Sequence, residues 1–202
     1  MLTQILPQDP TQRNKLFLLF IIALFAVPLA LAWVLVSSVS PDSTKNHGEL
    51  LNPAQPVPHL SASQIDGQPL TKADLRGRWN LLYIAGTSCD ERCKTGLYDI
   101  RQVRVALGKN TPRSQTLFLL QEAPDAELLD WLQREHVGLT VAVADSQTLN
   151  FFTQAFAGDA VFGDWIYLID PLGNLFMRYS TTVDPKGILD DLRHLLKISK
   201  IG

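Results

Sequence analysis

The sequence is poor in cysteine and in net charge, and both shortages narrow the possible functions. The 202 residues carry 18 Lys+Arg against 20 Asp+Glu, a formal net charge of -2. This balance gives no electrostatic footprint for nucleic acid, so we expect no nucleic-acid partner. The chain has only two cysteines, Cys89 and Cys93, and any thiol chemistry must use that pair. The length suits one domain of ordinary size plus a tail.

Residues 16–36 are 21 residues without a charge, LFLLFIIALFAVPLALAWVLV. At 1.5 Å per residue a helix of this length spans about 30 Å, the thickness of a bilayer core. Pro28 is tolerated in a membrane helix, and Trp33 suits the interface. A cleaved signal peptide is the alternative, since Ala30-Leu31-Ala32 resembles a cleavage motif. A signal h-region is usually about 7–15 residues, so we predict an uncleaved, single-pass transmembrane anchor.

The charges beside this run predict its orientation. Arg13 and Lys15 precede it, whereas Lys45 is the only basic residue in the stretch that follows. By the positive-inside rule, residues 1–15 stay in the cytoplasm and the rest of the chain crosses the inner membrane into the periplasm. Residues 37–59, rich in serine and proline, then predict a flexible linker. The folded domain is expected to occupy residues 60–202.

Both cysteines lie where a predicted strand gives way to a predicted helix. The apolar run at residues 81–85 is typical of a buried strand, and Gly86, Thr87 and Ser88 supply turn and capping chemistry. Apolar residues then recur every three or four positions from residue 97 to residue 107, as on an amphipathic helix. Unpaired N–H groups and the helix dipole at such a helix start favour a thiolate.

The spacing of the pair leaves two chemistries open. Positions i and i+4 of a helix lie about 6 Å apart along its axis, and a disulfide tolerates Cα atoms about 4.4–6.8 Å apart. The same two sulfurs can close a disulfide or hold a soft metal ion. A purely structural disulfide is a third reading, disfavoured because so short a loop removes little chain entropy. The acids Asp90 and Glu91 between the cysteines oppose the thiolate form.

Alternating helix and strand signals continue to the C-terminus. Strands are predicted at residues 116–120, 139–143, 165–169 and 175–179, and helices at residues 124–135, 146–156 and 185–196. The last two strands, joined by Asp170-Pro171-Leu172-Gly173-Asn174, form a hairpin. This pattern predicts an α/β fold, a thioredoxin-like domain with a central mixed sheet flanked by helices.

Several of these segments resemble one known family. Asp66-Gly67, the stretch Leu75-Arg76-Gly77-Arg78-Trp79, the C-x-x-x-C of Cys89 and Cys93, and Tyr167-Leu168-Ile169-Asp170-Pro171-x-Gly173 are similar to the Sco/SenC family of cytochrome c oxidase assembly proteins. The resemblance covers roughly residues 60–200. It implies a thioredoxin-like fold that binds copper through the two cysteines and a distant histidine. It also implies as partner the oxidase subunit that carries the dinuclear copper site.

The chain departs from that family at the histidine. Residues 160–164, where the family carries it, are Ala-Val-Phe-Gly-Asp here. Two thiolates suit Cu(I), whereas Cu(II) wants a harder ligand; Asp164 is the nearest candidate. We expect none of His47, His59, His136 and His194 to be a ligand. We expect Phe162→His or Gly163→His to strengthen Cu(II) binding if the loop is placed as in the family.

Three functions fit these features. The first is a membrane-anchored periplasmic assembly factor for cytochrome c oxidase, which handles Cu(I), exchanges thiols and disulfides, or does both. The second is a general thiol–disulfide oxidoreductase, an enzyme with Cys89 as attacking thiolate and Cys93 as resolving thiol. The third is a copper-free scaffold of the same family. Copper titration, reduction assays and the effect of a double-serine variant distinguish them.

Overall fold

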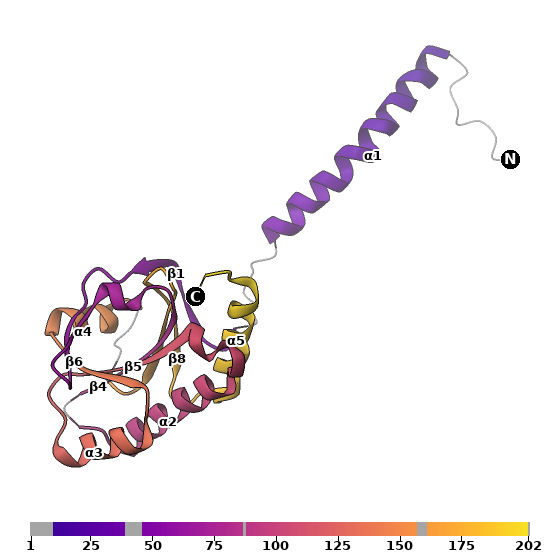
Figure 1. The fold of residues 1–202 in the computed structure, drawn as a ribbon. Coiled ribbons are helices and arrows are strands. Elements are labelled where there is room, and N and C mark those ends of the chain that lie inside the picture. The colour runs from indigo at the N-terminus through magenta and orange to yellow at the C-terminus, as the bar shows by residue number, and fades with distance from the viewer. Residues whose placement is uncertain (1–9, 39–45, 87, 157–160, 202) are drawn as a thin grey trace. The chain divides into compact units, whose positions relative to one another are not determined.

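The computed structural model describes residues 10–38, 46–86, 88–156 and 161–201 (Figure 1). The chain divides into two compact units, Met1–Lys45 and Asn46–Gly202.

The described part of the first unit, residues 10–38, forms one long helix, α1 (Pro10–Ser38), with Pro28 inside it. Its segment Arg13–Leu35 has 23 residues, a mean hydropathy of 2.8 in its most apolar window, and no part buried against protein. A helix this long and apolar is a candidate membrane span, because its exposed leucine and phenylalanine side chains need an apolar environment.

The second unit is built on one mixed sheet of eight strands in the order β1-β8-β7-β4-β5-β6-β2-β3. Strand β4 is parallel to β5, and β5 to β6, whereas the other neighbouring pairs are antiparallel. The strands are β1 (Glu49–Pro56), β2 (Ser61–Gln64), β3 (Pro69–Thr71), β4 (Trp79–Ala85), β5 (Ser114–Leu120), β6 (Leu139–Ala144), β7 (Trp165–Ile169) and β8 (Asn174–Ser180). The central strands β4 and β5 are buried along their whole length, as expected for strands covered on both faces.

Helices cover both faces of this sheet. The first core packs α2 (Glu91–Ala106), α3 (Ala126–Glu135) and α5 (Pro185–Ile198) against one face. The second core packs α4 (Ser146–Gln154) and the 3-10 helix η1 (Lys72–Leu75) against the other; a second 3-10 helix, η2 (Gly108–Arg113), precedes β5. Figure 1 shows α2 and α5 together, away from α4. The predicted thioredoxin-like α/β fold with a mixed sheet is confirmed.

The predicted linker is wrong over its second half. Residues 39–45 lie outside the described residues, but Glu49–Pro56 forms strand β1, paired antiparallel with β8. Glu49 Oε2 accepts a hydrogen bond from Arg178 Nε at 2.7 Å, and the buried Arg178 guanidinium lies 3.8 Å from the Trp165 ring centroid. This strand escaped prediction because an edge strand tolerates proline and polar residues.

The histidine that precedes β1 is also tied to the folded unit. His47 N donates to Asp191 Oδ2 at 2.9 Å, and its ring Nδ1 lies 3.2 Å from Asp191 Oδ1. Tyr179 donates its hydroxyl to the same carboxylate at 3.2 Å. His47 is exposed but tied to α5 by these contacts with Asp191, so the folded unit begins before residue 60.

Candidate functional site: the cysteine turn

The two cysteines form a disulfide between the end of β4 and the start of α2. Their Cα atoms are 5.1 Å apart, shorter than the separation expected from a helix because Cys89 precedes the helix. The residue that caps α2 is Asp90, whose Oδ1 accepts a hydrogen bond from Cys93 N at 2.9 Å. Cys93 therefore lies in the first helical turn, where backbone N–H groups need acceptors.

The two sulfurs differ in access to solvent. Cys93 is 2% exposed and belongs to the first core, whereas Cys89 is half-buried and packs on the edge of that core. Asp90 and Glu91 beside them are exposed. An attacking group from solvent reaches Cys89 more easily than Cys93. This asymmetry matches the roles of attacking and resolving thiol that the sequence predicts.

Tyr83 of β4 packs against α2, the helix that begins at the cysteine turn. Its ring is fully buried and leaves little room for a side chain at Gly96, where a Cβ atom would meet ring atom Cε2 at 3.1 Å. Its hydroxyl donates to Gly163 O at 2.8 Å. Burial, followed by the charge of Asp90, raises the pKa of Tyr83, so the hydroxyl keeps its proton and its role as donor. Sequence analysis missed this residue because it reads as one more apolar strand position.

The loop before β7 packs against the same end of β4. Gly163 N donates to Ile84 O at 2.9 Å, and Thr181 N donates to Asp164 O at 2.9 Å. The next side chain, Asp164, reaches the cysteine turn, where its Oδ1 lies 2.6 Å from Arg92 Nη1. This hydrogen bond, reinforced by the negative charge of Asp164, raises the pKa of Arg92. Asp164, the weak ligand candidate of the sequence, is thus engaged with a cation.

The two residues proposed for replacement by histidine are poorly placed. Phe162 packs against the second core, on the face of the sheet opposite to the core that holds Cys93. Gly163 has φ +92°, a conformation that a residue with a side chain rarely adopts. Position 164, whose side chain contacts Arg92 of the cysteine turn, is the better place for an imidazole.

The histidines are engaged elsewhere. His59 Nε2 lies 2.9 Å from Asp145 Oδ2, and this hydrogen bond is the main reason that the pKa of Asp145 falls to about 2. His136 is 5% exposed, with its ring centroid 4.6 Å from that of Trp131. Burial lowers its pKa. His136 ends α3 as its C-cap residue, and its side chain is buried.

The donor set of the turn fits a soft monovalent ion. Across residues 10–38, 46–86, 88–156 and 161–201, no group of three or more Cys, His, Asp and Glu side chains could hold a metal ion. Once reduced, Cys89 and Cys93 supply two sulfurs and no third ligand. Two soft sulfurs suit Cu(I), whereas Cu(II) requires harder ligands.

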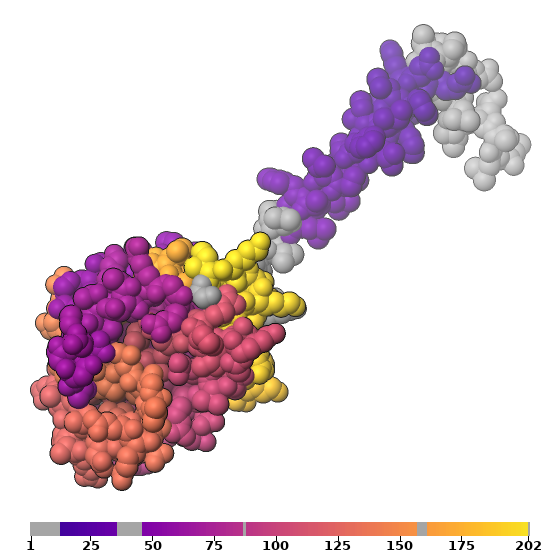
Figure 2. Space-filling view, in the orientation of Figure 1, coloured from indigo at the N-terminus to yellow at the C-terminus, as the bar shows by residue number. Residues whose placement is uncertain are grey.

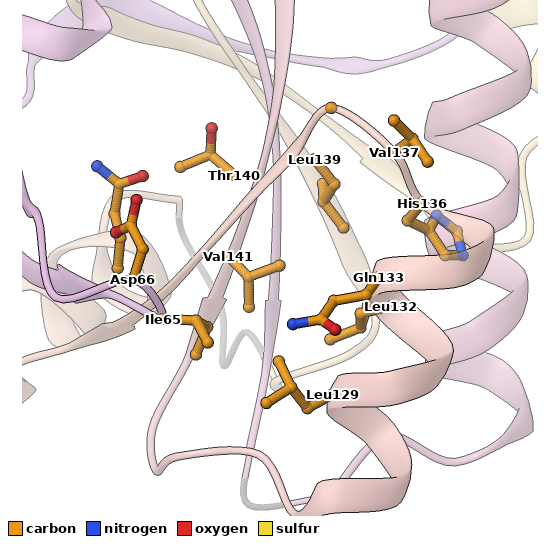
Figure 3. Close-up of a pocket in the computed structure, with 12 residues that line it drawn as sticks. Ile65, Asp66, Leu129, Leu132, Gln133, His136, Val137, Leu139, Thr140 and Val141 are labelled. Atoms are coloured by element: carbon orange, nitrogen blue, oxygen red, sulfur yellow. The ribbon is translucent and has the colours of Figure 1, made fainter.

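A separate hollow lies between α3 and β6 (Figure 3). Its volume is about 520 Å³, and it is lined by apolar side chains, among them Leu129 and Leu132, and by polar ones, among them Asp66, Gln133 and Thr140. In Figure 2 the orange segment that forms most of its wall adjoins the purple segment that contributes residues 64–66. No cysteine lines this hollow, so it is distinct from the cysteine turn.

Comparison with known proteins identifies the family. A family model described as transmembrane-like, thioredoxin-like, C-terminal domain matches residues 79–199. The chain belongs to this family. The match begins at the first residue of β4 and ends just after α5, so it includes the cysteine turn and the loop before β7.

One curated relative and many solved structures are similar to the chain. A Stutzerimonas stutzeri protein named "Putative copper-binding protein" is 26% identical over 108 residues, 50% of this chain and 53% of the relative. The chain thus spans about half the length of that relative.

Two solved structures illustrate the likeness of fold. Yeast Sco1 with copper bound is 19% identical, with a TM-score of 0.59 over 73% of this chain and 95% of that chain. BsSco, a member of the Sco family of cytochrome c oxidase assembly proteins in which a disulfide switch was identified, is 14% identical, with a TM-score of 0.57 over 73% and 96%. The resemblance to Sco/SenC proteins is confirmed at the level of the fold.

Proposed function

We propose that this protein is a membrane-anchored assembly factor that prepares the copper site of cytochrome c oxidase through Cys89 and Cys93. Residues 1–15 lie in the cytoplasm, α1 spans the inner membrane, and the folded unit works in the periplasm. The reduced pair holds Cu(I) as cargo, and the same pair exchanges electrons with cysteines of the oxidase subunit that carries the dinuclear copper site.

The observation that carries this proposal is the closed Cys89–Cys93 disulfide at the junction of β4 and α2. A disulfide across so short a loop contributes about 2 kcal/mol to stability, less than the roughly 3 kcal/mol of a fifteen-residue loop, and Cys89 is only half-buried. Such a bond is suited to opening and closing. The copper named in the relatives, together with the Sco-like fold, supports metal cargo as the second use of the same sulfurs.

The exposure of the two sulfurs suggests an order of events for thiol exchange. The Cys89 thiolate attacks a disulfide of the partner protein, forming a mixed disulfide and releasing one partner cysteine as a thiolate. The Cys93 thiolate then attacks Cys89 Sγ, releasing the second partner thiolate and leaving the Cys89–Cys93 disulfide. Two electrons pass to the partner, and the partner's cysteines are left reduced and ready for copper.

Copper handling can be tested by anaerobic titration with Cu(I) against a competing chelator. The reduced full-length chain in detergent is used. Tight binding of one Cu(I) is expected, and Cys89→Ser should weaken it strongly because one of two sulfurs is lost. Glu91→Gln is the matched control, since it changes an exposed side chain in the same turn and keeps both sulfurs. Equal affinity of the wild type and Cys89→Ser would refute copper handling by this pair.

A general thiol–disulfide oxidoreductase is the second candidate, favoured by the same asymmetric disulfide. It predicts reduction of an unrelated substrate such as insulin at a rate comparable to that for an oxidase peptide with two cysteines. An assembly factor prefers the oxidase peptide. A copper-free scaffold predicts instead that Cys89→Ser/Cys93→Ser restores oxidase activity in cells that lack the gene.

A further inference from the structure

We infer that Arg92 is a specificity-determining residue of the copper position: its guanidinium holds the Asp164 carboxylate as a counter-ion and thereby keeps a hard third ligand away from the two sulfurs. The inference rests on the proposed function. It adds a reason why the pair would accept Cu(I) and reject divalent ions.

The fold itself delivers Asp164 to the cysteine turn. Strands β4 and β7 are antiparallel, with Tyr83 opposite Ile166, so the residues just before β7 lie at the carboxyl end of β4, where the turn begins. Two hydrogen bonds hold the loop there, from Tyr83 to Gly163 O and from Gly163 N to Ile84 O. The Asp164 backbone cannot leave this end of the sheet without breaking them.

Arg92 belongs to the turn itself, one residue before Cys93. Its Nη1 lies 2.6 Å from Asp164 Oδ1, a short, charge-assisted hydrogen bond. The Arg92 side chain is 62% exposed and that of Asp164 36%. Exposed ion pairs contribute little to stability, so a purely structural role explains this contact poorly. Its consequence is local: a carboxylate bound to a guanidinium is a poorer metal ligand than a free one.

The other carboxylates of the turn also have hydrogen-bond or ion-pair partners. Asp90 accepts the hydrogen bond from Cys93 N, which the first turn of α2 needs. Glu91 pairs with Lys94 at 3.1 Å, and its side chain is 91% exposed. Asp164 is the carboxylate that a single substitution can release without disturbing the helix cap, and Arg92 is the group that holds it.

The chemical effect follows from ligand hardness. Two thiolates satisfy a soft ion such as Cu(I), whereas divalent first-row ions bind better when nitrogen or oxygen ligands complete the set. Arg92 competes with the metal ion for Asp164, and an exposed ion pair of this kind changes an equilibrium constant by about threefold. Releasing Asp164 should therefore raise divalent affinity by about threefold and leave Cu(I) affinity nearly unchanged.

The test is a titration of the reduced full-length chain in detergent with Co(II), which thiols do not reduce, alongside the Cu(I) titration. Arg92→Gln should bind Co(II) about threefold more tightly than the wild type, with stronger visible absorption as the ligand set changes. The double variant Arg92→Gln/Asp164→Asn should return to wild-type affinity. Arg101→Gln, which removes the same charge from α2 far along the helix, should leave Co(II) affinity unchanged.

The outcomes separate this inference from the proposed function. Normal Cu(I) binding without a Co(II) gain in Arg92→Gln overturns the role of Arg92 alone. A gain that persists in the double variant, or that Arg101→Gln reproduces, also overturns it, because charge removal and not Asp164 would then be the cause. A wild type that binds no Cu(I) overturns the proposed copper handling and this inference together.

Discussion

Reducing the Cys89–Cys93 disulfide should lower the free energy of unfolding of the folded unit by about 2 kcal/mol. The cysteines are four residues apart. In the chain-entropy model a closed loop of about five residues removes about 7 cal/mol/K from the unfolded chain, or about 2 kcal/mol at 25 °C. We expect the native contacts of the turn to survive reduction, because Cys93 belongs to the first core and Asp90 caps α2.

The same free energy must also appear in the equilibrium between the disulfide and the two thiols. If the disulfide stabilises the fold by about 2 kcal/mol, the fold stabilises the disulfide equally, and the reduction potential of the folded pair lies about 40 mV below that of the unfolded chain. Urea unfolding with and without reductant, followed by tryptophan fluorescence, measures the stability. Thiol–disulfide equilibration in native buffer and in concentrated urea measures the potentials.

A double variant provides the control for the stability measurement. Cys89→Ser/Cys93→Ser without reductant should unfold like the reduced wild type, and added reductant should not change it. A loss above about 4 kcal/mol on reduction would exceed what so short a loop can supply and would identify a structural disulfide. A loss near zero would refute the entropy reasoning and its redox counterpart.

Three further changes test the site and its surroundings. Gly96→Ala should lower stability by about 1 kcal/mol, because pressing on the fixed Tyr83 ring costs about 1–3 kcal/mol and better helix propensity returns about 1; urea unfolding measures it. Burial lowers the pKa of His136, so below pH 6.5 the unfolded chain binds a proton that the folded chain excludes. The free energy of unfolding should therefore fall as the pH falls from 7.5 to 5. His136→Phe should lose this part of the pH dependence. Asp164→His should raise Cu(II) affinity on the order of tenfold, and Phe162→His should not, as electron paramagnetic resonance of the Cu(II) form can decide.

Much of the fold could be predicted because its central strands are continuous apolar runs. Residues 81–85 and 116–120 are buried on both faces, and such strands can be predicted from their own composition alone. Strand β1 could not be predicted, since its prolines and polar residues pair only with β8 at the edge of the sheet. Its pairing with β8, far along the chain, stabilises β1 as a strand, whereas its own composition does not favour one.

The candidate site could be predicted only in part, for a similar reason. The spacing of Cys89 and Cys93 is local information, and it was sufficient to predict that the two cysteines can form a disulfide. The engagement of Asp164 with Arg92 joins residues 72 positions apart, so it depends on the order of strands in the sheet. Tyr83 was overlooked because nothing in its own segment indicates that a loop far along the chain accepts its hydroxyl.

The topology of the sheet explains why the short loop before β7 matters for this site. Because β7 is antiparallel to β4, the residues that precede β7 lie beside the carboxyl end of β4, where the cysteine turn begins. The residue that ends this loop, Asp164, therefore lies near the end of β4 and contacts the cysteine turn through Arg92. A carboxylate there is neutralised by a cation from the turn, whereas an imidazole would remain available as a ligand. We therefore expect that one substitution in this loop, Asp164→His, adds a nitrogen ligand to the two sulfurs and favours retention of Cu(II).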